Sequence, residues 1–216
     1  MKTPFTVEQF LEVFRSYNEA VWPMQVFLYL FGVVIVALSI KKTHSSYKII
    51  TLVLAFLWLW MGIVYHLLYF SSINKAAYLF GAAFILQGFL IFYIGIIKKS
   101  LSFHFKTDIY GIVGAVFILY AIIIYPLVGY SLGHIYPASP TFGLPCPTTI
   151  FTFGVFLLSE KKVPWILVLI PFLWAIIGST AVFVLGIKED AGLLISAIIT
   201  TTMVLSRNHV LKKEQV

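Results

Sequence analysis

The sequence predicts an all-α integral membrane protein, built as a bundle of seven transmembrane helices. Apolar runs of about 20 residues recur along the chain, which is the length that an α-helix needs to cross a bilayer. Hydrophobic residues make up 61% of the 216 residues and charged residues 11%, whereas about a quarter of the residues in soluble domains are charged. The basic residues fall mainly in short clusters between the apolar runs, a pattern typical of membrane proteins.

The first predicted element is an amphipathic surface helix over residues 5–20. Thr6 and Gln9 have the spacing of a capping box, in which each side chain satisfies a backbone N–H of the first helical turn. Apolar residues recur at helical spacing behind this cap, so one face of the helix is expected to pack on the bundle or on the membrane surface. This face contains Phe10, Leu11 and Phe14.

The apolar runs occupy residues 22–206, and a basic cytoplasmic tail over residues 207–216 follows them. Together with the surface helix they form a single transmembrane domain over residues 1–216, because the chain leaves no room for a second core. The predicted spans are 22–40, 49–70, 76–97, 109–130, 147–159, 164–187 and 190–206.

The distribution of basic residues predicts the orientation of the bundle. Cytoplasmic loops of membrane proteins carry an excess of lysine and arginine. Eleven of the 15 basic residues follow the first, third, fifth and seventh spans, and only Lys2, Arg15, Lys75 and Lys188 lie on the other side. The N-terminus is therefore expected outside and the C-terminus in the cytoplasm, which requires an odd number of crossings.

The fifth span is too short to cross a bilayer by itself. A helix over residues 147–160 would be about 21 Å long, whereas the hydrocarbon core is about 30 Å thick. The preceding stretch, GHIYPASPTFGLPCPTT at residues 133–149, is rich in proline and has no charged side chain. Non-helical backbone is tolerated at membrane depth only where it is buried in protein or lines a wet cavity. We therefore expect a re-entrant segment that folds into the outer half of the bundle and meets the short helix.

This re-entrant segment is the strongest candidate for a functional site. Pro147 suits the first turn of a helix, and the free N–H groups of that turn attract anions or electron-rich ligand atoms. Transporters use interrupted helices for binding in this way. The candidate ligand-binding side chains, in the segment or on the facing spans, are His66, Gln87, His134, Tyr136, Thr148 and Thr149.

A metal centre is a second hypothesis for the same region. His66, His134 and Cys146 are all expected in the outer half, and their donor atoms suit zinc, copper or haem iron. Each residue also has a structural interpretation. The histidines can hold hydrogen bonds at packed positions, Cys146 can be a small buried apolar residue, and Gln87 can bond across helices. Both interpretations stay open from the sequence.

Several functional classes lack their motifs. The chain has no HExxH, GxSxG or P-loop motif. Its single cysteine excludes an internal disulfide and a CxxC site. No predicted span carries two acidic residues, which argues against a carboxylate-based cation/proton antiporter. The net charge of +7 is spread over separate loops and forms no single basic face, so nucleic acid is not an expected partner.

Three stretches carry a resemblance to a known family: PFTVEQFLEVFRSYNEAVWP at residues 4–23, WMGIVYH at residues 60–66, and GHIYPASPTFGLPCPTTIFTFG at residues 133–154. Over nearly its whole length the chain resembles an uncharacterised family of bacterial multi-pass inner-membrane proteins, known only as a domain of unknown function. The resemblance implies a protein of the bacterial inner (plasma) membrane. It implies no activity and no ligand.

Three functional hypotheses follow, all of them with the lipid bilayer as the surroundings. In the first, residues 133–149 form an outward-facing polar site of a transporter-like or binding protein for a small solute or metal ion. In the second, His66, His134 and Cys146 serve a membrane-embedded metal- or haem-dependent enzyme. In the third, the chain is an accessory subunit covered by a membrane protein partner. A sealed apolar inner half would count against transport.

Overall fold

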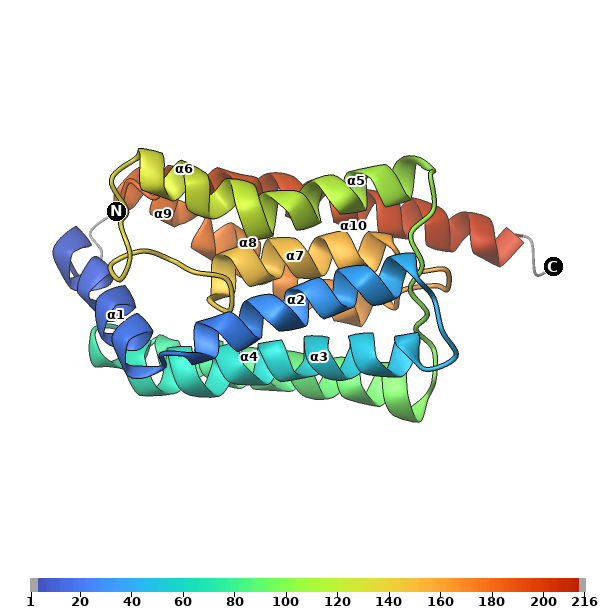
Figure 1. The fold of residues 1–216 in the computed structure, drawn as a ribbon, viewed down its shortest axis with the longest axis horizontal. Helices are drawn as coiled ribbons and strands as arrows, with labels where there is room; N and C mark the ends of the chain where they lie inside the picture. Colours follow the sequence, from blue (N-terminus) through green and yellow to red (C-terminus); the bar gives the residue numbers. More distant parts are fainter. Residues whose placement is uncertain (1–3, 214–216) are drawn as a thin grey trace.

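The computed structural model describes residues 4–213, and these residues form a helical bundle (Figure 1). No β-strand occurs among them, and their only strand-like pairings are two isolated bridges. The predicted all-α class is therefore confirmed. Lys2 and residues 214–216 of the expected basic tail lie outside the described part of the chain.

The helices follow the predicted spans closely. Five predicted spans are each made of two or more helical elements in succession. The elements are α1 (Val7–Ala20), α2 (Met24–Ile40), α3 (Ser46–Trp60) with η1 (Met61–Tyr69) and η2 (Phe70–Ser72), α4 (Ala77–Phe92) with η3 (Tyr93–Ile97), α5 (Ile109–Leu119) with η4 (Tyr120–Ile124) and α6 (Tyr125–Ser131), α7 (Pro145–Leu157), α8 (Trp165–Gly178) with α9 (Thr180–Val184), and η5 (Lys188–Asp190) with α10 (Ala191–Lys213).

Several of these helices are long and apolar enough to cross a membrane. Within the described residues five helical runs meet that condition, and α1 with α2 would make a sixth if the bent pair is one span. The α7 helix has 13 residues and is apolar but shorter. The structure thus supports a membrane protein, while a count of seven crossings depends on treating α2 and α7 as spans of their own.

The amphipathic helix is present as α1, with the predicted cap. Thr6 Oγ1 accepts from the backbone N–H of Gln9 at 3.2 Å, and Gln9 Oε1 accepts from the N–H of Thr6 at 2.9 Å. α1 makes an angle of 88° with α2 and lies across one end of the bundle (Figure 1). We call this end the α1 end. The opposite end, where the lysine-containing loops lie, is the basic end.

The α7 helix lies at the centre of the bundle, and almost all of its residues are buried. It packs against α5, α10 and α8. Gly154 allows a close approach to α5, because a Cβ there would lie 2.7 Å from the carbonyl oxygen of Gly114. α7 begins well inside the α1 end of the neighbouring helices (Figure 1). The predicted short fifth helix is therefore correct.

The bounds of this helix differ from the predicted 147–159 by two residues. α7 begins at Pro145 because proline suits a first-turn position, where its missing N–H has no intrahelical partner to lose. α7 ends at Leu157 because the chain then turns and Ser159 forms an antiparallel bridge with Phe103.

The basic end of α7 is closed by hydrogen bonds. Arg207 of α10 donates from Nη1 to the carbonyl oxygen of Leu157 at 2.9 Å and from Nη2 to that of Phe156 at 3.1 Å. These carbonyls belong to the last turn of α7, where a helix leaves carbonyl groups without intrahelical partners. The Phe156 carbonyl also accepts from the backbone N–H of Ser159 at 3.2 Å. A positive charge at a helix C-terminus is also favourable to the helix dipole.

Glu160 connects the loops beside this cap. Its Oε2 accepts from Lys42 at 2.5 Å and from Ser102 at 2.8 Å, and Lys106 lies 3.9 Å from its Oε1. Burial disfavours the charged carboxylate, but the hydrogen bonds from Lys42 and Ser102 and the two lysine charges together hold the pKa of Glu160 below its usual 4.5. Glu160 therefore stays ionised and ties three loops together.

The middle of the bundle contains one predicted candidate, Gln87 of α4. Pro171 interrupts α8 and has no N–H to give to the carbonyl of Leu167, four residues earlier. Gln87 Nε2 donates to this carbonyl oxygen at 2.7 Å. Its Oε1 has no partner within residues 4–213. Gln87 thus repairs a proline-broken helix, in agreement with the cross-helix interpretation.

Candidate functional site

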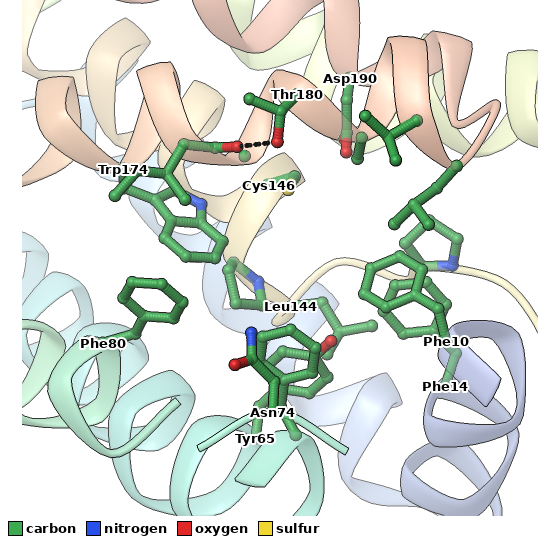
Figure 2. Close-up of a pocket in the computed structure, with 18 of the residues that line it drawn as sticks. Phe10, Phe14, Tyr65, Asn74, Phe80, Leu144, Cys146, Trp174, Thr180 and Asp190 are labelled. Atoms are coloured by element: carbon green, nitrogen blue, oxygen red, sulfur yellow. Dashed lines mark hydrogen bonds between the residues drawn. The ribbon is translucent and has the colours of Figure 1, made fainter. Parts of the chain in front are cut away.

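A cavity of about 180 Å³ lies at the α1 end, above the N-terminus of α7 (Figure 2). Helices α1, η1, α4, α8 and α9 contribute its walls, and its lining is mostly aromatic and aliphatic. Asn74 is partly exposed and Thr180 is exposed, so the cavity reaches the surface. The lining side chains that carry the argument below are Tyr65, Phe80, Cys146, Trp174, Thr180 and Asp190.

The N-terminus of α7 forms one wall of the cavity. Leu144 precedes the helix and gives no side-chain cap, and Pro145 and Pro147 occupy positions that would otherwise present N–H groups. Cys146 therefore supplies the only backbone N–H among the first three helical residues. This differs from the expected anion-attracting turn, because the prolines remove most of the donors that an anion would bind.

The re-entrant segment is held in place by Asn18 of α1. Asn18 Nδ2 donates to the carbonyl oxygens of Pro137 at 2.7 Å and Ser139 at 2.9 Å, and its Oδ1 accepts from Thr141 at 3.0 Å. Asn18 is completely buried. One side chain thus satisfies much of the polar backbone of the segment, as is required of irregular backbone in an apolar setting.

The end of the segment is closed by a sharp turn at Gly143. Its φ of +99° is in the region that favours glycine, and a Cβ there would overlap Leu28. The N–H of Gly143 donates to Thr148 Oγ1 at 2.9 Å, so Thr148 stabilises the turn. Thr149 is also buried, and its hydroxyl has no hydrogen-bond partner in the described residues.

Two adjacent acidic residues, Glu189 and Asp190, are buried at the start of the α10 run. Tyr125 donates to Asp190 Oδ1 at 2.5 Å. His134 Nδ1 lies 2.7 Å from Glu189 Oε1, while Glu189 Oε2 has no partner in residues 4–213. Gly129 makes room for Glu189, because a Cβ there would lie 3.0 Å from its Oε1.

The sequence interpretation missed this acidic pair. It assigned Glu189 to a loop and used Asp190 only as the first residue of a span, whereas the helical run begins at Lys188 and buries both acids. The absence of a span with two acidic residues was therefore a wrong inference. The signal available was an acidic pair directly before an apolar run, since acidic side chains favour helix N-termini.

His66 lies behind the cavity wall. Its ring packs edge-on against Phe84, with the centroids 4.6 Å apart, and against Trp174 at 5.1 Å. The residue is fully buried, and neither ring nitrogen has a partner among the described residues. His66 is packed as the structural interpretation expected, but it makes none of the hydrogen bonds that this interpretation assigned to it within the described residues.

The predicted site residues are thus dispersed. Cys146 lines the cavity beside Asp190, whereas His66, Gln87, His134, Tyr136, Thr148 and Thr149 do not line it. Tyr136 lies in the re-entrant segment and is largely exposed.

The predicted metal centre needed His66, His134 and Cys146 to converge. Within residues 4–213 no group of three or more His, Cys, Asp and Glu residues is placed to hold a metal ion. His66, His134 and Cys146 therefore do not form one centre with three protein ligands, which is the minimum that zinc sites use.

Comparison with known families supports the resemblance of the sequence. Residues 7–215 match a family described as "Family of unknown function (DUF6064)". The chain belongs to this family. The DUF6064 description assigns no activity, so the function rests on the geometry of the site. No curated protein and no solved structure matches the chain.

Proposed function

We propose that this DUF6064 protein is a multi-pass membrane protein that binds a small solute in the cavity at the α1 end. The proposal rests on the cavity of about 180 Å³. It has apolar walls and a few polar groups, and it lies beside the N-terminus of the short helix α7. Small-molecule sites commonly combine an apolar lining with a few convergent polar groups. They also occur where membrane helices are interrupted.

The proposal includes seven crossings, with the α1 end outside. If α2 and α7 are spans, most of the lysine residues lie on one side, which agrees with the positive-inside rule. The bacterial inner membrane is proposed on the resemblance to bacterial multi-pass proteins.

Labelling of single cysteines tests this orientation. Lys75 at the α1 end and Lys161 at the basic end are both exposed. In a Cys146→Ser background, Lys75→Cys should react in intact cells with a membrane-impermeant maleimide, and Lys161→Cys should react only after permeabilisation. The reverse pattern, or labelling of both in intact cells, would contradict the orientation.

Binding is favoured over a continuous pore. The core beyond the cavity is mostly apolar, with large buried side chains such as Trp58, Phe151 and Phe156, and it also holds buried hydroxyl groups such as that of Thr152. The single glutamine at mid-depth, Gln87, is engaged with the backbone of α8. The site is thus open toward one end of the bundle and closed toward the other. Transport would require a second arrangement of the helices.

The cavity can be tested through Thr180, which is exposed and lines it. In a Cys146→Ser background, Thr180→Cys should react with a small thiol reagent applied from outside. Adding Ala181→Trp, which places an indole in the cavity, should slow this reaction at least about tenfold. Lys75→Cys, at the same end but away from the cavity, should react equally with and without Ala181→Trp. Unchanged labelling of Thr180→Cys in the filled variant would refute an accessible cavity.

A further inference from the structure

We propose that the solute bound in this cavity is a small organic cation, paired with the carboxylate of Asp190 and enclosed by aromatic rings. This inference rests on the proposed binding function and names its ligand class. It follows from the charge, the unpartnered polar atoms and the ring faces that the cavity presents.

Among the described residues, the lining of the cavity contains an acidic side chain and no basic one. Asp190 is the only charged side chain among the described residues that line the cavity. It is buried, with 2% of its surface exposed, and its hydrogen bond from Tyr125 supplies no positive charge. A buried carboxylate is costly unless a cation or a proton accompanies it. No basic side chain among the described lining residues accompanies Asp190, so the cavity has room beside this carboxyl group for a cation to take the place of a proton.

The neighbouring Glu189 is a second buried acid that favours a positive partner nearby. It is fully buried, and among the described residues His134 is the one group able to carry positive charge that contacts it. Its second carboxylate oxygen is without a partner in the described chain. Lys188, next in sequence, is exposed. His134 thus pairs with Glu189 and not with Asp190, which leaves the Asp190 side of the acidic pair for a ligand.

The walls favour an organic cation over a metal ion. Tyr65, Phe70, Phe80 and Trp174 line the cavity, and aromatic faces attract ammonium groups, most strongly where water is excluded. Divalent metal ions need several oxygen or nitrogen ligands, and residues 4–213 contain no group of three or more His, Cys, Asp and Glu residues that could hold one. A weakly hydrated alkylammonium group fits both the single carboxylate and the rings.

A second polar group points to an acceptor atom on the same ligand. Only 8% of the surface of Trp174 is exposed, and its Nε1 has no hydrogen-bond partner in the described residues. Figure 2 shows this indole beside Cys146 on the cavity wall, with Asp190 on the same side. Sulfur is a weak acceptor, so the indole N–H remains available to a hydroxyl or carbonyl oxygen of the ligand.

The test compares two molecules of equal shape. Choline carries a quaternary ammonium group and a hydroxyl, and 3,3-dimethylbutan-1-ol replaces its nitrogen with carbon. Calorimetric titration of the purified full-length protein in detergent should give at least about tenfold tighter binding of choline. Asp190→Asn should abolish this preference. Glu160→Gln, which removes an acid at the basic end, should leave it unchanged.

A second variant tests the cation inference if Asp190→Asn does not fold. Phe80→Leu removes one ring and should weaken choline binding more than binding of the neutral alcohol, because only the cation is attracted to the ring face. Equal binding of the two molecules would overturn the cation inference and leave the binding cavity standing. Binding of neither molecule would overturn it as well. If the labelling of Thr180→Cys were unchanged by Ala181→Trp, this result would separately refute the accessible cavity.

Discussion

The two ends of α7 differ in how they treat polar groups. At the basic end Arg207 satisfies the last carbonyls of the helix, and Glu160 is held by Lys42 and Ser102. At the α1 end the helix has no side-chain cap, and unpartnered atoms of Trp174 and Glu189 lie in or beside a cavity.

This difference distinguishes the basic end of α7, whose polar contacts stabilise the fold, from the α1 end, which we propose binds a ligand. A buried polar group without a partner lowers stability by about 1–3 kcal/mol, so a structure that serves only to fold should not gather such groups at one place. The basic end largely follows that expectation, with the buried Nε of Arg207 as an exception among the described residues. The α1 end does not, and a ligand that supplies the missing partners is the physical reason we propose.

The largest expected effect concerns the Arg207 cap. Arg207→Met removes two charged hydrogen bonds and leaves the Leu157 carbonyl without its donor, while the Phe156 carbonyl keeps the N–H of Ser159. The change should cost about 3 kcal/mol. The midpoint of thermal unfolding in detergent measures this. Lys161→Met is the control, since Lys161 also donates to a backbone carbonyl at this end but is exposed. Similar melting of both variants would mean that the basic end is not sealed by Arg207.

A smaller loss is expected at the α1 end from Asn18→Ala. The carbonyls of Pro137 and Ser139 lose their donor, and the segment can partly recover by meeting water, so the cost should be about 2 kcal/mol. Limited proteolysis should then cut within residues 133–144. Ser16→Ala, on the exposed face of the same helix, should change neither stability nor cleavage. Uncut Asn18→Ala would show that α1 does not hold the segment.

In the middle of the bundle, a double-mutant cycle of Gln87 and Pro171 should show a smaller loss of stability than Asn18→Ala. Gln87→Met removes the donor to the Leu167 carbonyl and should cost about 1.5 kcal/mol. Pro171→Ala restores a backbone N–H that can take the same role, so Gln87→Met should cost less in that background. The unfolding midpoints of the four proteins give the coupling. Additive effects would argue that Gln87 has another role, such as binding a solute.

The smallest effect is the pH dependence of the basic end. Because the pKa of Glu160 is lowered on folding, its contribution is present above pH 4.5 and is lost as the pH falls through the lower folded value. Wild type should lose stability on acidification more than Glu160→Gln does, by less than about 1 kcal/mol since the pairs are partly exposed. Glu19→Gln, at an exposed position of α1, should behave as wild type. Parallel pH curves for wild type and Glu160→Gln would count against the Glu160 network.

Much of the architecture could be predicted because its signals are local. The capping box of Thr6 and Gln9, the apolar runs, and the prolines before the fifth span each act within a few residues. The helix class, the approximate bounds and the short α7 follow from them. Cys146 was expected near the site for the same reason, since it lies in the first turn of α7.

The partners of the polar side chains could not be predicted in this way. Asn18 meets residues 119 and 121 positions further along the chain, and Arg207 reaches back 50 positions. His66 was expected to face a site, but the rotation of its helix directs it into a cluster of rings. Such rotations depend on the packing of several helices at once and leave no mark in one stretch of sequence.

By itself the sequence determined that the chain is helical, approximately where its helices lie, and that the fifth is short, because periodicity, prolines and caps act between near neighbours. Only the tertiary structure decided that Glu189 and Asp190 are buried together, that His134 pairs with one of them, and that the other faces an aromatic cavity. These outcomes depend on which helix faces meet, and burial of a charge is a property of the assembled bundle.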